Sequence, residues 1–126
     1  MSVDEIERAF RGDTAAPAHA RNFVVDVLGL WGRPDLIDDA MLIVSELSTN
    51  AVLHGRSEFV VQLRRNGSNV RIEVIDDSGH EPLPATAEQL ATSGRGLSLI
   101  AALSQSWGFD LIADGKSVWA ELSATV

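Results

Sequence analysis

The chain has 126 residues, 45 % of them apolar and 22 % charged, and 10 Lys and Arg against 18 Asp and Glu give it a formal net charge of −8. A chain of this length forms one domain, here residues 1–126, with a packed core, and without cysteine it holds no disulfide or thiolate site. The acidic balance argues against general nucleic-acid binding, which needs clustered Lys and Arg, and no apolar run reaches the roughly 18 residues of a membrane span, so we expect a cytoplasmic protein.

The N-terminal half predicts one strand and two helices. A short strand is expected over residues 6–10, before a turn with Gly12 and Pro17. Apolar residues recur at helical spacing over residues 17–31. A second helix is predicted from about Asp35, in the N-cap position, to His54, with Gly55 just past its end.

A hairpin follows, with strands at residues 58–65 and 69–76 joined by Asn66, Gly67 and Ser68. In the second strand Val70, Ile72 and Val74 share one face, so Asp76 falls on the core side. Residues 77–95 form a long connection with two prolines, and such loops are commonly functional.

The C-terminal part predicts a helix over residues 97–106 and strands over 107–113 and 117–123, with a turn at Asp114 and Gly115. Hairpin strands grouped with helices in this way favour an α+β fold, a two-layer sandwich with a mostly antiparallel sheet and helices on one face.

Glu46 and Asn50 lie one turn apart on the second helix, so their side chains share a face. Carboxylate and carboxamide oxygens suit Mg²⁺ with its waters, and a carboxylate can act as a general base. The alternative is a solvated polar face. Leu42, Ile43 and Leu53 interrupt that face, which indicates that it is covered.

Asp76 ends a strand whose core face is otherwise Val and Ile, and a buried carboxylate there needs donors. If it faces a pocket, it can accept from the exocyclic amine of a purine. The alternative is that Asp76 caps a turn with the next three residues.

Gly94, Arg95 and Gly96 open the third helix. Two glycines let the backbone approach a ligand closely, and a helix N-terminus offers free N–H groups to an anion. The alternative is a plain entry from the loop into the helix.

Five segments along the chain resemble conserved boxes of one family. They are residues 46–54 (ELSTNAVLH), 74–79 (VIDDSG) followed by Pro82, 94–97 (GRGL), 107–108 (WG) and 115–122 (GKSVWAEL). On these segments the chain is similar to the ATP-binding anti-sigma factor serine kinases, which are histidine-kinase-like (Bergerat) ATPases of the anti-sigma regulatory type. The likeness covers about residues 6–123.

The resemblance implies a catalytic and base-binding set. Glu46 matches the family's general base and Asn50 its Mg²⁺ ligand. Asp76 matches the acid that binds the adenine amine, and Gly79 lets the strand end approach the base. Ser117 takes the place of a residue that supports the adenine, although strand alternation puts it on the face opposite to the core unless a bulge intervenes.

The resemblance also implies a phosphate-binding set. Residues 78–96 match the ATP lid. The backbone amides that hold the phosphates are those of Gly94, Arg95, Gly96 and Leu97. His80 stands where the family's usual pattern has a second glycine.

The implied function is that of a kinase that binds Mg·ATP and phosphorylates a serine of an anti-anti-sigma partner of the STAS-domain type. A sigma factor as partner and a homodimer are also implied, with no direct nucleic-acid or membrane partner. One alternative is a module that binds ATP or ADP as an allosteric ligand without transfer. Another, the catalytic domain of a sensor histidine kinase, is disfavoured because the chain has no separate phosphoacceptor-helix domain.

Overall fold

The structure is a computed structural model that describes residues 4–54, 58–76, 96–112 and 115–123. Within these ranges, no helix is both long and apolar enough to cross a membrane. The elements along the chain are β1 (Glu5–Arg11), α1 (Ala16–Leu30), the 3₁₀ helix η1 (Pro34–Leu36), α2 (Ile37–His54), β2 (Glu58–Asn66), β3 (Asn69–Asp76), α4 (Gly96–Leu103), β4 (Ser106–Ile112) and β5 (Gly115–Ser123).

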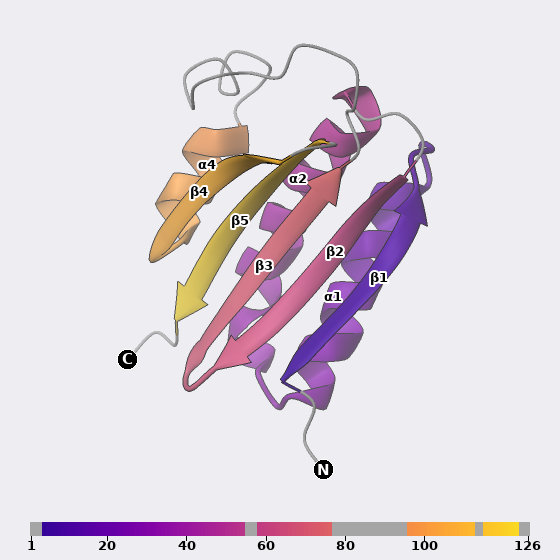
Figure 1. Cartoon of the computed structure of the whole chain (residues 1–126). Helices are drawn as coiled ribbons and strands as arrows, with labels where there is room; N and C mark the ends of the chain where they lie inside the picture. Colours follow the sequence, from indigo (N-terminus) through magenta and orange to yellow (C-terminus); the bar gives the residue numbers. More distant parts are fainter. Residues whose placement is uncertain (1–3, 55–57, 77–95, 113–114, 124–126) are drawn as a thin grey trace.

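The strands form one sheet in the order β1-β2-β3-β5-β4, and each neighbouring pair is antiparallel. The α-helices cover one face of this sheet, with α2 between α1 and α4 (Figure 1). The other face, which we call the open face, carries no helix within the described residues. The predicted α+β sandwich of two layers is therefore confirmed.

The predicted β2–β3 hairpin is confirmed, but β2 is one residue longer and the turn one residue shorter than predicted. Asn66 pairs with Asn69, so Gly67 and Ser68 form the turn. Gly67 has a φ of 62°, which suits the first central position of a type II′ turn, where glycine is preferred. Because the turn fixes the register, the alternation of β3 is fixed as well.

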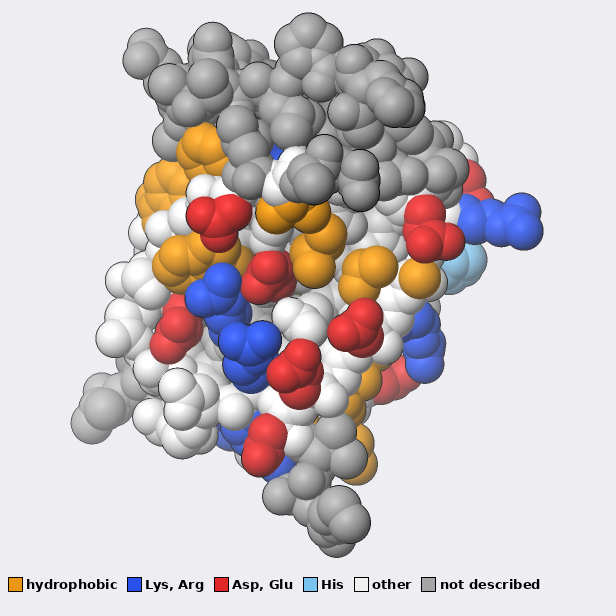
Figure 2. Space-filling model, viewed as in Figure 1, with side chains coloured by type: hydrophobic (Ala, Val, Ile, Leu, Met, Phe, Trp, Pro, Cys, Tyr) orange, Lys and Arg blue, Asp and Glu red, His pale blue; other side chains and the backbone are white. Residues whose placement is uncertain are grey.

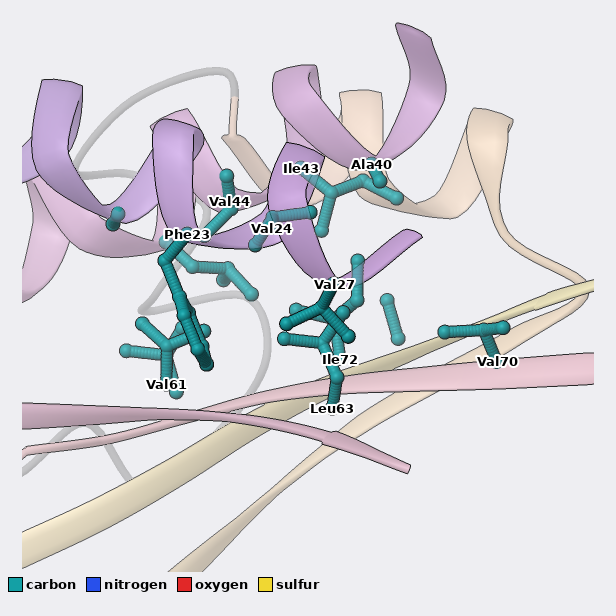
Figure 3. Close-up of a cluster of buried hydrophobic side chains, with 14 of the residues drawn as sticks. Phe23, Val24, Val27, Ala40, Ile43, Val44, Val61, Leu63, Val70 and Ile72 are labelled. Carbon is teal, nitrogen blue, oxygen red and sulfur yellow. The ribbon is translucent and has the colours of Figure 1, made fainter. Parts of the chain in front are cut away.

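The core lies between the sheet and the two long helices. Every second residue of β2 and β3 points at α1 and α2, and the side chains meet in one apolar cluster (Figure 3). The residues labelled there are Phe23, Val24, Val27, Ala40, Ile43, Val44, Val61, Leu63, Val70 and Ile72. Burial of this apolar area is the main stabilising contribution to the fold.

Three phenylalanines attach the edge strand β1 to the rest of the sandwich. The rings of Phe10 and Phe59 stack with centroids 5.5 Å apart, and Phe23 of α1 meets Phe10 edge-on at 6.0 Å. These are favoured aromatic geometries. The predicted strand over residues 6–10 is thus confirmed, with one more residue at each end.

The prediction that Asp35 caps the second helix is wrong. Residues 34–36 form the 3₁₀ turn η1, and α2 begins at Ile37. The Arg33 guanidinium donates from Nε and Nη2 to the two oxygens of Asp35, each at 3.1 Å. These hydrogen bonds lower the pKa of the Asp35 carboxyl. Arg33 Nη1 also donates to the Ser68 carbonyl oxygen at 2.7 Å, which ties this connection to the β2–β3 turn.

Several boundaries differ in the C-terminal part. α4 begins one residue earlier than predicted, at Gly96, and β4 covers residues 106–112 rather than 107–113. The helix predicted to reach residue 106 ends at Leu103, because the Gln105 amide donates to the Glu121 carbonyl oxygen at 2.8 Å and Ser106 already pairs with Glu121. The last strand begins at Gly115, two residues earlier than predicted. The expected loop over residues 77–95 and the helix-ending Gly55 lie outside the described residues.

Replacing Leu63 by alanine should lower the free energy of unfolding by about 2–5 kcal/mol, because Leu63 is fully buried and its loss leaves a cavity. Urea denaturation measures the change. Leu30→Ala is the matched control, since Leu30 is 73 % exposed and its loss should change the stability by less than about 0.5 kcal/mol. Equal effects of the two variants would contradict the core described above.

Candidate functional site

Glu46 and Asn50 are half-buried residues in the second half of α2. They are four residues apart, so the two side chains lie one turn apart on the same side of the helix. Of the apolar neighbours that interrupt this side, Ile43 is fully buried and Leu42 is exposed. The side is therefore neither fully solvated nor part of the sheet-facing core.

The flank of α2 that carries these two residues turns away from α1. α1 contacts the opposite flank, where Arg21 Nη1 donates to Ser45 Oγ at 3.2 Å. At about 100° per residue, Asn50 lies roughly 140° around the helix from Ser45. Because α2 packs against both α1 and α4, the flank with Glu46 and Asn50 is on the side of α4.

Asp76 is the last residue of β3 and points to the helix side of the sheet. Its register partners are Phe59 on β2 and Lys116 on β5. The residue is 5 % exposed, so the expected position on the core side is confirmed. A carboxylate at this depth requires partners, and one of them is Lys116.

The Lys116 ammonium lies 3.8 Å from Asp76 Oδ2, and each of the two side chains is 4 % exposed. The sequence analysis predicted no role in the site for Lys116. Strand alternation contained the signal, because Val118, Ala120 and Leu122 face the core and Lys116 has the same parity. Because the strand was predicted to begin at residue 117, Lys116 was not counted among the strand residues.

Four elements that carry candidate residues have an end at the same end of the sandwich. β3 and α2 end there, and β5 and α4 begin there (Figure 1). Asp76 and Lys116 therefore lie at the same end as the half of α2 that carries Glu46 and Asn50. Gly96 and Leu97 are the first two residues of α4, so they are at this end as well.

Ser117 is not brought together with these residues. It pairs with Ile75 and faces the open side of the sheet, as the alternation predicted. There the Ser117 hydroxyl donates to Glu73 Oε2. Glu73 also pairs with Arg71, at 3.3 Å between Nη2 and Oε1. Figure 2 shows the open face, on which acidic and basic side chains lie close together.

Gly108 lies against the ring of Trp119 on the neighbouring strand. A Cβ at Gly108 would be 2.8 Å from Cζ2 of Trp119, so this close approach requires glycine. The Arg71 guanidinium, from β3 on the other side of β5, lies 4.2 Å from the centroid of the Trp119 ring. This distance is typical of cation–π contacts. Packing of the two strands against each other therefore explains why Gly108 and Trp119 occur at these positions.

Three of the predicted residues, Gly79, Gly94 and Arg95, lie outside the described residues, as does nearly all of the predicted lid. Within the described ranges, no three His, Cys, Asp or Glu side chains form a group suited to a metal ion. Among the described candidate residues, Glu46, Asn50 and Asp76 offer side-chain oxygen donors. A carboxylate, a carboxamide and a few phosphate oxygens are the donors that Mg²⁺ takes in nucleotide sites, so the residues fit that ion.

A comparison with protein-family models gives a match over nearly the whole chain. The model described as the histidine kinase-like ATPase domain matches residues 10–122. Every predicted site residue, from Glu46 to Ser117, falls inside this range. No curated protein matches the chain.

Replacing Lys116 by methionine should lower the free energy of unfolding by about 3 kcal/mol, because it leaves Asp76 as a buried charge that has lost its cation. Arg64→Met is the matched control. Arg64 pairs with Glu5 at 3.4 Å on the open face, and both side chains are about half exposed, so its loss should change the stability by less than about 1 kcal/mol. Urea denaturation compares the two, and equal losses would refute a buried ion pair.

Proposed function

This chain belongs to the histidine kinase-like ATPase domain family, and from that premise we propose that it binds ATP with Mg²⁺ and transfers the γ-phosphate to a serine of a protein partner. The partner that we propose is an anti-anti-sigma factor with a STAS domain, and the regulated protein is a sigma factor. The family membership itself gives an ATP-binding domain of regulatory type. The transfer, the partner and the sigma factor are the proposed steps.

One observation carries the proposal. The C-terminal half of α2, which carries an acid and a carboxamide, runs toward the end of the sandwich where β3 ends in a buried carboxylate and α4 begins (Figure 1). Together they offer an acceptor for a base amine, oxygen ligands for a metal ion and backbone N–H groups for an anion. These are the three parts that a purine nucleoside triphosphate needs.

The base and the phosphates would bind to different elements. Asp76 would accept a hydrogen bond from the adenine amine. The amides of Gly96 and Leu97 at the start of α4 would face the phosphates, because the first N–H groups of a helix have no partner within it. We propose the same role for Gly94 and Arg95, and a contact between Gly79 and the base.

Asn50 would hold the magnesium ion through its carboxamide oxygen. When bound, Mg²⁺ neutralises phosphate charge and orients the phosphates for transfer. The position of Asn50 on the α4 side of α2 supports this role, since the free amides at the start of α4 lie at the same end.

Glu46 would act on the serine that receives the phosphate. In the transfer, the serine oxygen forms a bond to the γ-phosphorus while the bond from phosphorus to the β–γ bridging oxygen breaks, and ADP leaves. The serine proton passes to the Glu46 carboxylate. Glu46 is half-buried, which leaves the carboxylate accessible while its helix is held by the core.

Regulation would follow from linkage between nucleotide and partner. A nucleotide changes the affinity for a sigma factor or an antagonist only to the extent that it binds two states of the domain differently. A second candidate function keeps the same site but omits the transfer: a domain that binds ATP or ADP and thereby controls its partner. The acid at position 46 favours the kinase.

Replacing Asn50 by alanine should weaken Mg·ATP binding by roughly tenfold or more, because a ligand oxygen to a cation is worth at least a charged hydrogen bond of about 1.5 kcal/mol. Isothermal titration measures the affinity. Thr49→Ala is the control, since Thr49 is the exposed neighbour on the same helix, and it should bind Mg·ATP as the wild type does. An unchanged affinity in Asn50→Ala would remove Asn50 from the site.

Replacing Glu46 by glutamine should slow phosphate transfer by about 10²- to 10⁴-fold, the usual contribution of a general base, and should leave the affinity for ATP within a few-fold. The measurement is transfer of label from γ-labelled ATP to candidate STAS-domain proteins. Tight ATP binding by the wild type without transfer to any partner serine would favour the domain that only binds nucleotide.

A further inference from the structure

We propose that Lys116 occupies the place of the base amine at Asp76, so that a nucleotide has to displace the Lys116 ammonium to make that hydrogen bond. The inference rests on the proposed function, because it concerns base recognition at the same site. Lys116 is then a specificity-determining residue: it decides how much the exocyclic amine contributes to nucleotide affinity.

The contact itself is the first observation. Lys116 and Asp76 are register partners on adjacent antiparallel strands, so the pairing of β3 with β5 holds the two backbones opposite each other. The ammonium nitrogen is 3.8 Å from Oδ2. Lys116 is the only lysine in the chain, and it is placed where a carboxylate is buried.

Burial is the second observation. The Asp76 side chain is only 4 % exposed, so a further donor can reach the carboxylate only if a neighbouring group moves away. A lysine has a flexible four-carbon stem with a compact charge at its end, whereas the β-strand backbones around it are fixed by their pairing. The Lys116 side chain can therefore move away from the carboxylate while the strands stay paired.

The Lys116 ammonium and the base amine compete for the same carboxylate, and their chemistry decides how much the amine adds to nucleotide affinity. An ammonium and an aminopurine NH₂ are both N–H donors, and the carboxylate only accepts. The Lys116 ammonium carries a full charge 3.8 Å from Oδ2, and such an ion pair is strengthened by the low dielectric constant inside a protein, whereas a neutral base amine offers one hydrogen bond without that charge. A neutral base amine that replaces the ammonium thus gains little, and the amine should add almost nothing to the affinity of the wild type.

The test compares two nucleotides that differ only in this amine. Purine riboside 5′-triphosphate has hydrogen in place of the 6-amino group of ATP. The affinities of both are measured by isothermal titration with Mg²⁺ for the wild type, for Lys116→Met and for the control Arg64→Met. Arg64→Met removes one positive charge from the open face, so it accounts for any effect of net charge.

In the wild type and in Arg64→Met, we expect ATP and purine riboside triphosphate to bind within about threefold of each other. In Lys116→Met the preference for ATP should rise to about tenfold or more, because the amine then meets a carboxylate without its cation. A merely structural role of Lys116 would weaken both ligands alike and leave the ratio unchanged, and that result would overturn the inference.

A second variant covers a failure of Lys116→Met to fold. The double variant Asp76→Asn with Lys116→Met carries no charge in the pair, and its carboxamide oxygen still accepts from a base amine. Its preference for ATP should also exceed that of the wild type, and a ratio equal to the wild type would refute the inference. If neither nucleotide binds the wild type, both the proposed function and this inference are wrong. If ATP binds and the ratio of the two affinities is the same in all variants, only the proposed role of Lys116 is wrong.

Discussion

The alternation of side chains along β3 is the constraint on which the site depends. A strand sends successive residues to opposite faces, so the run that buries Val70, Ile72 and Val74 also turns Asp76 toward the helices. The antiparallel register with β5 then brings Lys116 opposite Asp76. The same packing that stabilises the sandwich thus places a carboxylate and its cation at the end of the sheet. A shift of β5 by one residue in this register would turn Lys116 to the open face, while Asp76 would stay on the helix side.

Much of the fold follows from local pattern. The helical spacing of α1 and α2 and the turn at Gly67 were sufficient to predict two helices and a hairpin with the right core face. The errors lie where a specific side-chain contact or strand pairing decides the outcome. The bonds from Arg33 to Asp35 replace the expected helix cap, and the pairing of Ser106 with Glu121 ends α4 early. No local propensity contains those contacts.

The site was predictable to a different extent for each residue. The spacing of Glu46 and Asn50 fixed their common side of α2, but only the Arg21–Ser45 contact shows that this side turns away from α1. Asp76 followed from alternation alone. The role of Ser117 was predicted only from the family resemblance. The register places its side chain on the open face, where it contacts Glu73. Lys116 shares the parity of the core residues, yet a late predicted start of the last strand hid it. The roles of Gly79, Gly94 and Arg95 stay predictions.

Lysine and arginine are used differently in this chain. Its one lysine is 3 % exposed, and arginine supplies the other nine of the ten basic residues. Reagents that acylate primary amines therefore meet a single side-chain target, which is shielded as long as the strands stay paired and its carboxylate holds it. Chemical labelling of that amine would report directly on the opening of this end of the sandwich, with no probe introduced into the protein.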